Sequence, residues 1–305
     1  MDPSKFRILL DYTSRPLSLL HPKLRLGLAK LFNHEVISTI LDPNSINSRQ
    51  RNRFGEVNHR ISFVGDTRMV VNINEMIGYR SALNSSYDLT AFRVAQNLKF
   101  ENLHYVDIGA NIGTTLIPIA SRGCYCVAFE PNIMVAKRLL ANLEMNKYQK
   151  VEIILAALGD AARSGSWLSL LNNAGNSGAV SLNLSQEQKP HGKLVRVASL
   201  DSALSKDFLQ SIEATGGKLL IKIDVEGLEA EVIRGGWNLI QTFRPVMLLE
   251  QNPGRDFEKV CEELTEIGYK IHTVSESLTL GVVNPNTRYE NVIAIPLWAE
   301  GISSE

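Results

Sequence analysis

In the last two-thirds of the chain, short apolar runs alternate with segments of helical length. Seven runs read as strands, at residues 104–108, 124–130, 151–158, 218–225, 245–250, 269–274 and 290–296. Helical patterns lie between most of them, at residues 114–121, 133–146, 200–215, 229–239 and 256–267. This alternation is typical of βαβ units and predicts an α/β fold with a mostly parallel, Rossmann-like sheet. The last two strands have no helix between them, so we expect an antiparallel pair at one edge.

The N-terminal part follows a different pattern. Helical fragments lead into a polar connector at residues 42–53, which predicts a helical extension over residues 1–55 and a main domain over residues 56–305. Residues 60–74 alternate around the turn dipeptide Gly65-Asp66 and predict a hairpin, and residues 87–98 predict a helix. Residues 159–199 are rich in Ser, Asn and Gly and form an insert with room for a short hairpin.

Composition narrows the class of protein. The 32 Lys and Arg balance the 32 Asp and Glu, so we expect a small-molecule or other neutral partner rather than nucleic acid. Three Cys without a Cys-x-x-Cys pair disfavour a disulfide framework and a zinc site, and favour a cytoplasmic location. No apolar window approaches the ~18 to 20 residues of a spanning helix, so stable membrane insertion is not expected. The sequence gives no indication of oligomeric state.

The strongest local feature is a glycine turn between the first strand of the series and the helix after it. In Val106-Asp-Ile-Gly-Ala-Asn-Ile-Gly113, Gly109 would allow a ligand close to the backbone and Gly113 would allow tight packing where the helix begins. Glu130 ends the next strand, at a spacing suited to binding both hydroxyls of a ribose. Together these residues predict an adenosine-containing ligand.

The chemistry of the turn distinguishes between such ligands. A dinucleotide fingerprint needs a second Gly where this chain has Asn111, because a pyrophosphate must approach the backbone there. Asp107 would repel a pyrophosphate but attract the amino group of a methionine moiety. S-adenosylmethionine carries that group and no phosphate, so it fits better than NAD.

A second cluster of acids follows the fourth and fifth strands. Asp224 and Glu226 lie at the end of the run at 218–225, and Glu250 ends the run at 245–250. Open α/β sheets bind their ligands at this edge, so we interpret Asp224 and Glu250 as site residues. Glu226 and Glu229 also suit a helix start, where acids stabilise the dipole without a catalytic role. Lys222 is expected to pair with a neighbouring acid.

At these residues the sequence resembles the FkbM family of S-adenosylmethionine-dependent methyltransferases. The similar blocks, in the family's order, are VDIGANIG at 106–113, FEP at 129–131, SLD at 199–201, KIDVEGLEAEVIRGG at 222–236 and LLE at 248–250. The resemblance implies a seven-stranded Rossmann-like methyltransferase domain. It also implies a small-molecule or glycan acceptor, methylated on a hydroxyl of a sugar or polyketide-type natural product.

The resemblance also implies roles for individual residues. Asp107, Gly109, Asn111 and Gly113 would hold the methionine end of the cofactor, and Glu130 its ribose. The turn that contains Ala157 and Leu158 would border the adenine. Tyr87 and Asp88 lie where family members often carry a Tyr-Glu pair, and the Asp in place of Glu leaves their cofactor contact open.

Methyl transfer to an alcohol also requires a base. Asp224 and Glu226 are the candidates, with Asp224 preferred because it is closest to the strand end. A rival mechanism would place Mg²⁺ on Asp224, Glu250 and Asn252, which offer hard oxygen ligands. Two other functions stay open at this point, namely an NAD-dependent oxidoreductase and a non-catalytic binding module with a methyltransferase fold.

Overall fold

The structure is a computed structural model of the 305-residue chain. It describes residues 58–62, 67–72, 88–148, 150–172, 180–183, 193–251, 256–283 and 291–300, with a few single positions between 75 and 81. The chain divides into two compact units, one of residues 1–87 with 174–177 and one of residues 88–173 with 178–305. The boundary expected at residue 55 lies outside the described residues and stays a prediction.

In the first unit, β1 (Asn58–Ser62) pairs antiparallel with β2 (Arg68–Asn72). The pairing runs from Asn58 opposite Asn72 to Ser62 opposite Arg68, so the residues between the strands span Gly65-Asp66. This confirms the predicted hairpin. Met69 and Val71 of β2 are buried, in keeping with the period of two along a strand.

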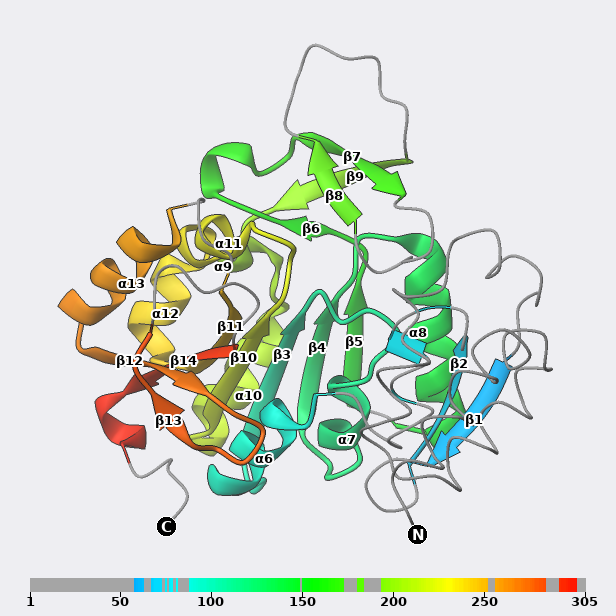
Figure 1. Cartoon of the computed structure of the whole chain (residues 1–305), viewed down its shortest axis with the longest axis horizontal. Coiled ribbons are helices and arrows are strands. Elements are labelled where there is room, and N and C mark those ends of the chain that lie inside the picture. The colour runs from blue at the N-terminus through cyan, green and yellow to red at the C-terminus, as the bar shows by residue number, and fades with distance from the viewer. Residues whose placement is uncertain are drawn as a thin grey trace, which may run out of the picture. The chain divides into compact units, whose positions relative to one another are not determined.

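The second unit is built on an eight-stranded sheet with the order β13-β12-β14-β11-β10-β3-β4-β5 (Figure 1). Its parallel strands are β3 (Leu103–Ile108), β4 (Tyr125–Phe129), β5 (Val151–Ile154), β10 (Lys218–Ile223) and β11 (Val246–Glu250). β14 (Asn291–Pro296) runs antiparallel between β11 and β12 (Tyr269–Val274), and the short β13 (Leu280–Gly281) is the outermost strand. The mostly parallel sheet and the antiparallel pair at one edge are confirmed, with one strand more than expected.

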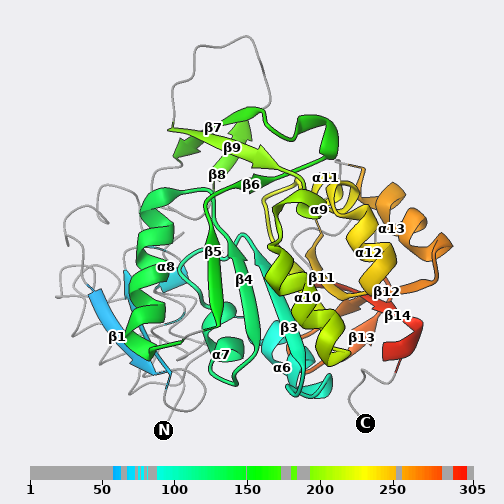
Figure 2. The ribbon, with the colours of Figure 1, turned by 180° about the vertical axis from the view of Figure 1, so that it is seen from behind.

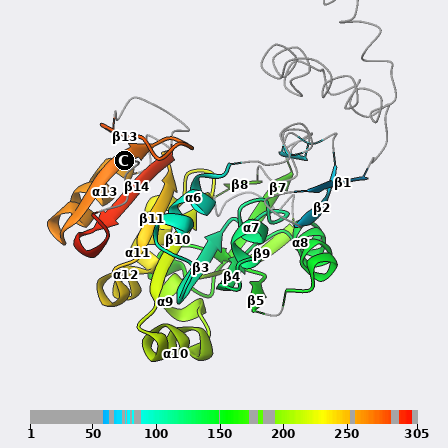
Figure 3. The same ribbon diagram turned by 90° about the horizontal axis from the view of Figure 1, so that it is seen from below.

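Helices cover both faces of this sheet. α6 (Thr90–Asn97) and α7 (Leu116–Ala120) lie on the face seen in Figure 1, and α8 (Ile133–Asn146) lies beside β5. The opposite face, seen from behind in Figure 2, carries α9 (Leu200–Ala203), α10 (Lys206–Thr215), α11 (Glu229–Gly235), α12 (Trp237–Phe243) and α13 (Phe257–Glu266). The view from below separates the two layers (Figure 3).

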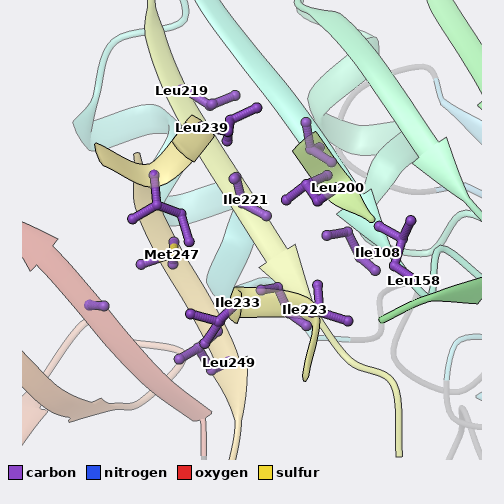
Figure 4. Close-up of a cluster of buried hydrophobic side chains, with 14 of the residues drawn as sticks. Ile108, Leu158, Leu200, Leu219, Ile221, Ile223, Ile233, Leu239, Met247 and Leu249 are labelled. Carbon is purple, nitrogen blue, oxygen red and sulfur yellow. The ribbon is translucent and has the colours of Figure 1, made fainter. Parts of the chain in front are cut away.

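The core explains which strand residues can serve the site. Ile108, Ile221, Ile223, Met247 and Leu249 belong to a buried cluster beneath the second group of helices (Figure 4). Because side chains alternate along a strand, the residues that directly precede or follow these core residues face the layer of α6 and α7. Asp107 of β3, Lys222 of β10 and Glu250 of β11 are three of those residues, so they share one face of the sheet.

A second, four-stranded sheet occupies the insert. β6 (Ala157–Leu158) pairs parallel with β9 (Lys193–Ala198), and β7 (Trp167–Asn172) pairs antiparallel with β9 and with β8 (Val180–Asn183). The hairpin expected in the insert is therefore present. The single strand expected over residues 151–158 was wrong, because β5 ends at Ile154 and β6 begins at Ala157, in the other sheet. Leu155, between them, is 49% exposed.

Two predicted helices are divided. The segment at 200–215 breaks where Ser205 caps α10 by accepting a hydrogen bond from Phe208 N at 3.1 Å. The segment at 229–239 ends its first helix at Gly235, and α12 begins at Trp237. A Cβ on Gly235 would lie 2.0 Å from the carbonyl oxygen of Gly159, so only Gly lets α11 approach that turn. In the part of the chain that the structure describes, no helix is long and apolar enough to cross a bilayer.

Candidate functional site

The glycine turn follows β3 and has a backbone that few residues can adopt. Gly109, Asn111 and Gly113 have φ angles of +83°, +52° and +95°. Gly109 N and Ala110 N donate to Phe129 O of the neighbouring strand, each at 3.0 Å, and Asn111 Oδ1 accepts from Ile112 N at 2.8 Å. The turn is thus fixed by its own backbone and by β4. Asn suits this position because it adopts positive φ more readily than other non-Gly residues.

The two glycines are required for close packing. A Cβ on Gly109 would lie 2.0 Å from the carbonyl oxygen of Asp224, so the strand end at β10 fills the space next to this glycine. A Cβ on Gly113 would meet Leu139 Cδ1 at 2.7 Å, which fits the tight packing expected where the helix begins. The close approach that we expected a ligand to make at Gly109 is made by the protein's own backbone.

Glu130 lies next to this turn and is almost fully buried, with 6% of its surface exposed. Its carboxylate accepts hydrogen bonds from Asn111 N at 3.1 Å and from Asn132 N at 2.8 Å. Burial raises the pKa of Glu130 to about 7, although the two backbone donors oppose the shift. A carboxylate with two oxygens retains lone pairs for further donors, so it can still receive ribose hydroxyls.

Asp107 lies beneath the turn, where it is fully buried. Thr115 Oγ1 donates to Asp107 Oδ2 at 2.6 Å. Its other oxygen, Oδ1, has no hydrogen-bond donor within the described part of the chain. Burial raises the pKa of Asp107, while the charge of Lys222 lowers it. Since an unpaired buried oxygen is costly, Oδ1 is a natural acceptor for a ligand or water donor.

The end of β10 carries the second set of predicted residues. Asp224 is bound to Lys222, whose Nζ lies 2.8 Å from Asp224 Oδ2. Glu226 is exposed and has a φ of +56°. Glu229 is buried and accepts from Val225 N at 3.2 Å and Gly227 N at 3.0 Å. Glu229 therefore closes the turn before α11, a structural role that the sequence analysis allowed for.

A small pocket lies where these strands end. It is lined by Asp88, Thr90, Lys222, Asp224, Leu248, Glu250 and Asn291, together with backbone neighbours on β10 and β11. Asp88 comes from the segment before α6, and its Oδ1 accepts a hydrogen bond from Thr90 N at 3.1 Å. Burial, and then the charges of Asp224, Glu226 and Glu229, raise the pKa of Glu250 to about 8. The pocket therefore combines three carboxyl groups with one buried ammonium group.

The remaining predicted residues are spread over the surroundings. Ala157 and Leu158 are 4% and 3% exposed in β6, so the exposed Leu155 before them offers more surface to a ligand. Phe129 pairs with Ile154, and Glu130 N donates to Ile154 O at 3.2 Å, which places Leu155 beside Glu130. Tyr87 and Asn252 lie outside the described residues.

Sequence reasoning missed two contributions to the site. Asn142 of α8 is buried and donates from Nδ2 to Ile112 O at 3.0 Å, which anchors the glycine turn to the helix. Lys222 was expected to pair with an acid, but its place inside the pocket depends on strand register, because it lies opposite Asp107. An Asn on an otherwise apolar helix face is the signal that could have identified the first.

Comparisons with known proteins place the chain in a family. Residues 107–271, more than half of the chain, match the methyltransferase FkbM domain. No curated protein matches the sequence. A solved methyltransferase FkbM from Methylobacillus flagellatus KT has 13% identity and a TM-score of 0.44 over 92% of this chain and 57% of that one. A T. thermophilus 16S rRNA N2 G1207 methyltransferase has 14% identity and a TM-score of 0.40 over 79% of this chain and 50% of that one.

The matched residues contain the whole of the described site apart from Asp88, Thr90 and Asn291. The glycine turn, Glu130, Lys222, Asp224 and Glu250 all lie between residues 107 and 271. The chain spans 57% of the length of the Methylobacillus protein. The extent of the family match decides the assignment, and the chain belongs to the FkbM family of methyltransferases.

Proposed function

We propose that this methyltransferase moves a methyl group from S-adenosylmethionine to a hydroxyl oxygen, and that the acceptor is a sugar or a polyketide-type natural product. The observation that carries the proposal is the contact between Gly109 and the carbonyl of Asp224, which joins the glycine turn to the acidic pocket. A donor on the turn and an acceptor in the pocket would therefore lie side by side. Such alignment supplies much of the catalysis in an in-line methyl transfer.

The donor side of the proposal rests on the turn. The free oxygen of Asp107 suits the cationic amino group of the methionine moiety, and the turn at Gly109, Asn111 and Gly113 borders it. Glu130 would accept the ribose hydroxyls at the end of β4. Leu155, exposed beside Glu130 and adjoining Ala157 and Leu158, would cover the adenine.

The acceptor side rests on the pocket. The acceptor oxygen attacks the methyl carbon as the bond from carbon to the sulfonium sulfur breaks, which leaves neutral S-adenosylhomocysteine. The hydroxyl proton goes to a carboxylate within hydrogen-bond reach. Asp224 is the favoured base because it lines the pocket and its side chain is 38% exposed. Glu226 is the weaker candidate, because it is not among the residues that line the pocket.

Calorimetric titration with S-adenosylhomocysteine, and with NADH as the comparison, tests the donor. Saturable binding of S-adenosylhomocysteine and none of NADH would support the proposal, and the reverse would contradict it. An acceptor screen with a labelled methyl donor follows, over monosaccharides, polyketide alcohols and amines. Label in the alcohols supports oxygen as the methylated atom, whereas label in the amines alone would contradict it.

A further inference from the structure

Lys222 is a charged residue in a place where charges are rarely found. It lies in β10, a central strand of the sheet, and is only 8% exposed. Lysine is almost never buried to this degree unless it is paired. Its Nζ lies 2.8 Å from Asp224 Oδ2, within the range of a charge-assisted hydrogen bond. Asp224 therefore holds the ammonium group in place, and Lys222 is one of the residues that line the pocket.

Acids from three further elements surround this ammonium. Asp107 of β3 lies opposite Lys222 in the strand register, and both side chains face the layer of α6 and α7. Asp88 comes from the segment before α6, and Glu250 from the end of β11. Although burial lowers it, the pKa of Lys222 is raised overall, by Asp224, Asp107 and Asp88. The Lys222 ammonium group thus balances both Asp107, next to the glycine turn, and the acids of the pocket.

This arrangement does not fit the Mg²⁺ site that Asp224, Glu250 and Asn252 would form. The first of those ligands already binds an ammonium group through Oδ2. A divalent ion on the same carboxylate would bring two more positive charges within a few ångströms of Nζ, where like charges repel strongly. Among the described residues, moreover, no group of three or more His, Cys, Asp or Glu is arranged to hold a metal.

We infer that the Lys222 ammonium group takes the place of a divalent cation in this pocket and acts as a positioning residue that fixes Asp224 toward the acceptor. The part that concerns the acceptor rests on the proposed function. Without a metal to chelate, the acceptor needs to present only a single hydroxyl, in contrast to a substrate that must offer two adjacent oxygens. A single hydroxyl, of a sugar or of a polyketide-type product, meets that requirement.

Manganese binding tests the inference without an acceptor or turnover. The full-length protein, first stripped with EDTA, is titrated with Mn²⁺ in the wild-type form and as Lys222→Met and Lys222→Arg. We expect no saturable Mn²⁺ binding to the wild type or to Lys222→Arg at millimolar metal. Lys222→Met leaves the acids unbalanced and should bind Mn²⁺ about tenfold or more tightly than the wild type. Circular dichroism and urea denaturation of each variant show whether the fold is intact.

Two results would overturn the inference. One is saturable Mn²⁺ binding by the wild type that Asp224→Asn abolishes, because a metal would then occupy the pocket beside Lys222. The other is a folded Lys222→Met protein that binds Mn²⁺ no better than the wild type. If Lys222→Met fails to fold, the wild type and Lys222→Arg still decide the matter through the first result. Failure of the proposed function would appear separately, because the wild type would then not bind S-adenosylhomocysteine.

Discussion

The carbonyl oxygen of Asp224 lies 2.0 Å from the position that a Cβ on Gly109 would occupy. Asp224 N also donates to Ile108 O at 3.0 Å, so a backbone hydrogen bond holds the end of β10 against the end of β3 next to this contact. The relationship couples two parts of the site that are more than a hundred residues apart in sequence. The geometry of the glycine turn and the geometry of the pocket therefore depend on each other.

Gly109→Ala should therefore be much more destabilising than an ordinary glycine substitution. The alanine methyl would collide with backbone, which cannot move aside as a side chain can, and the φ of +83° adds strain. We expect a loss of about 3 kcal/mol or more in the free energy of unfolding. Gly123→Ala is the matched control, because Gly123 has a φ of +81° and open space around it, and it should cost about 1 kcal/mol. Urea denaturation measures both, and equal losses would contradict the contact.

Glu130 should make cofactor binding depend on pH near neutrality. The ionised carboxylate accepts ribose hydroxyls, and its pKa in the free protein is about 7. Affinity for S-adenosylhomocysteine should therefore strengthen as the pH rises from 6 to 8. Binding should be about tenfold weaker at one pH unit below the pKa than at one pH unit above it. Glu130→Gln should remove this dependence, whereas the exposed Glu213→Gln should keep it. Calorimetry across this range would refute the prediction if Glu130→Gln retained the wild-type profile.

The same group should affect stability in the opposite direction. Its folded pKa of about 7 lies above the ordinary value of 4.5, so the folded state binds the proton more tightly than the unfolded state. The free energy of unfolding should then fall as the pH rises from about 4.5 through about 7. Urea denaturation of the wild type and of Glu130→Gln over this range should show a shallower fall in the variant. A steeper fall in the variant would mean that Glu130 is ionised throughout.

The sequence predicted the parts of the fold that depend on local pattern. The apolar runs identified the strands of the main sheet, and the acids at their ends identified Glu130, Asp224 and Glu250, because parallel strands end at one edge. The pattern failed at Leu155 and Ala156, where one apolar run serves two sheets. Hydrophobicity indicates burial, and both halves of that run are at least partly buried. The apolar pattern therefore could not reveal that the chain leaves one sheet and enters the other.

Contacts between distant segments were also beyond the sequence. The pairing of Lys222 with Asp107 across two strands requires the register, which no local pattern encodes. Asp201, in the block SLD, is a similar case. Its carboxylate accepts from Asn238 N at 3.2 Å, Asn238 Nδ2 at 2.9 Å and Leu239 N at 2.9 Å, at the start of α12. This block is therefore explained by helix capping from a distant part of the chain.

Asp201→Ala should weaken the fold because it removes that cap. Two backbone donors at the start of α12 lose their acceptor, and we expect a loss of about 1 to 2 kcal/mol in the free energy of unfolding. Asp207→Ala is the control, since Asp207 is exposed in the first turn of α10, where the helix dipole accounts for about 0.3 to 1 kcal/mol. Denaturation of both variants checks the ranking. A loss for Asp201→Ala no larger than that for Asp207→Ala would remove the capping role.

Asp224→Asn should separate catalysis from cofactor binding. The asparagine keeps the shape of the side chain but cannot take the acceptor proton, so methyl transfer in a single turnover should slow by about a hundredfold or more. Binding of S-adenosylhomocysteine should change little, because the Asp224 backbone that packs on Gly109 is retained. Glu226→Gln is the matched comparison, because Glu226 is exposed and not among the residues that line the pocket. Rapid-quench assays with an acceptor from the screen measure both. Near wild-type rates with an unchanged pH profile in Asp224→Asn, together with a large loss in Glu226→Gln, would transfer the role of base from Asp224 to Glu226.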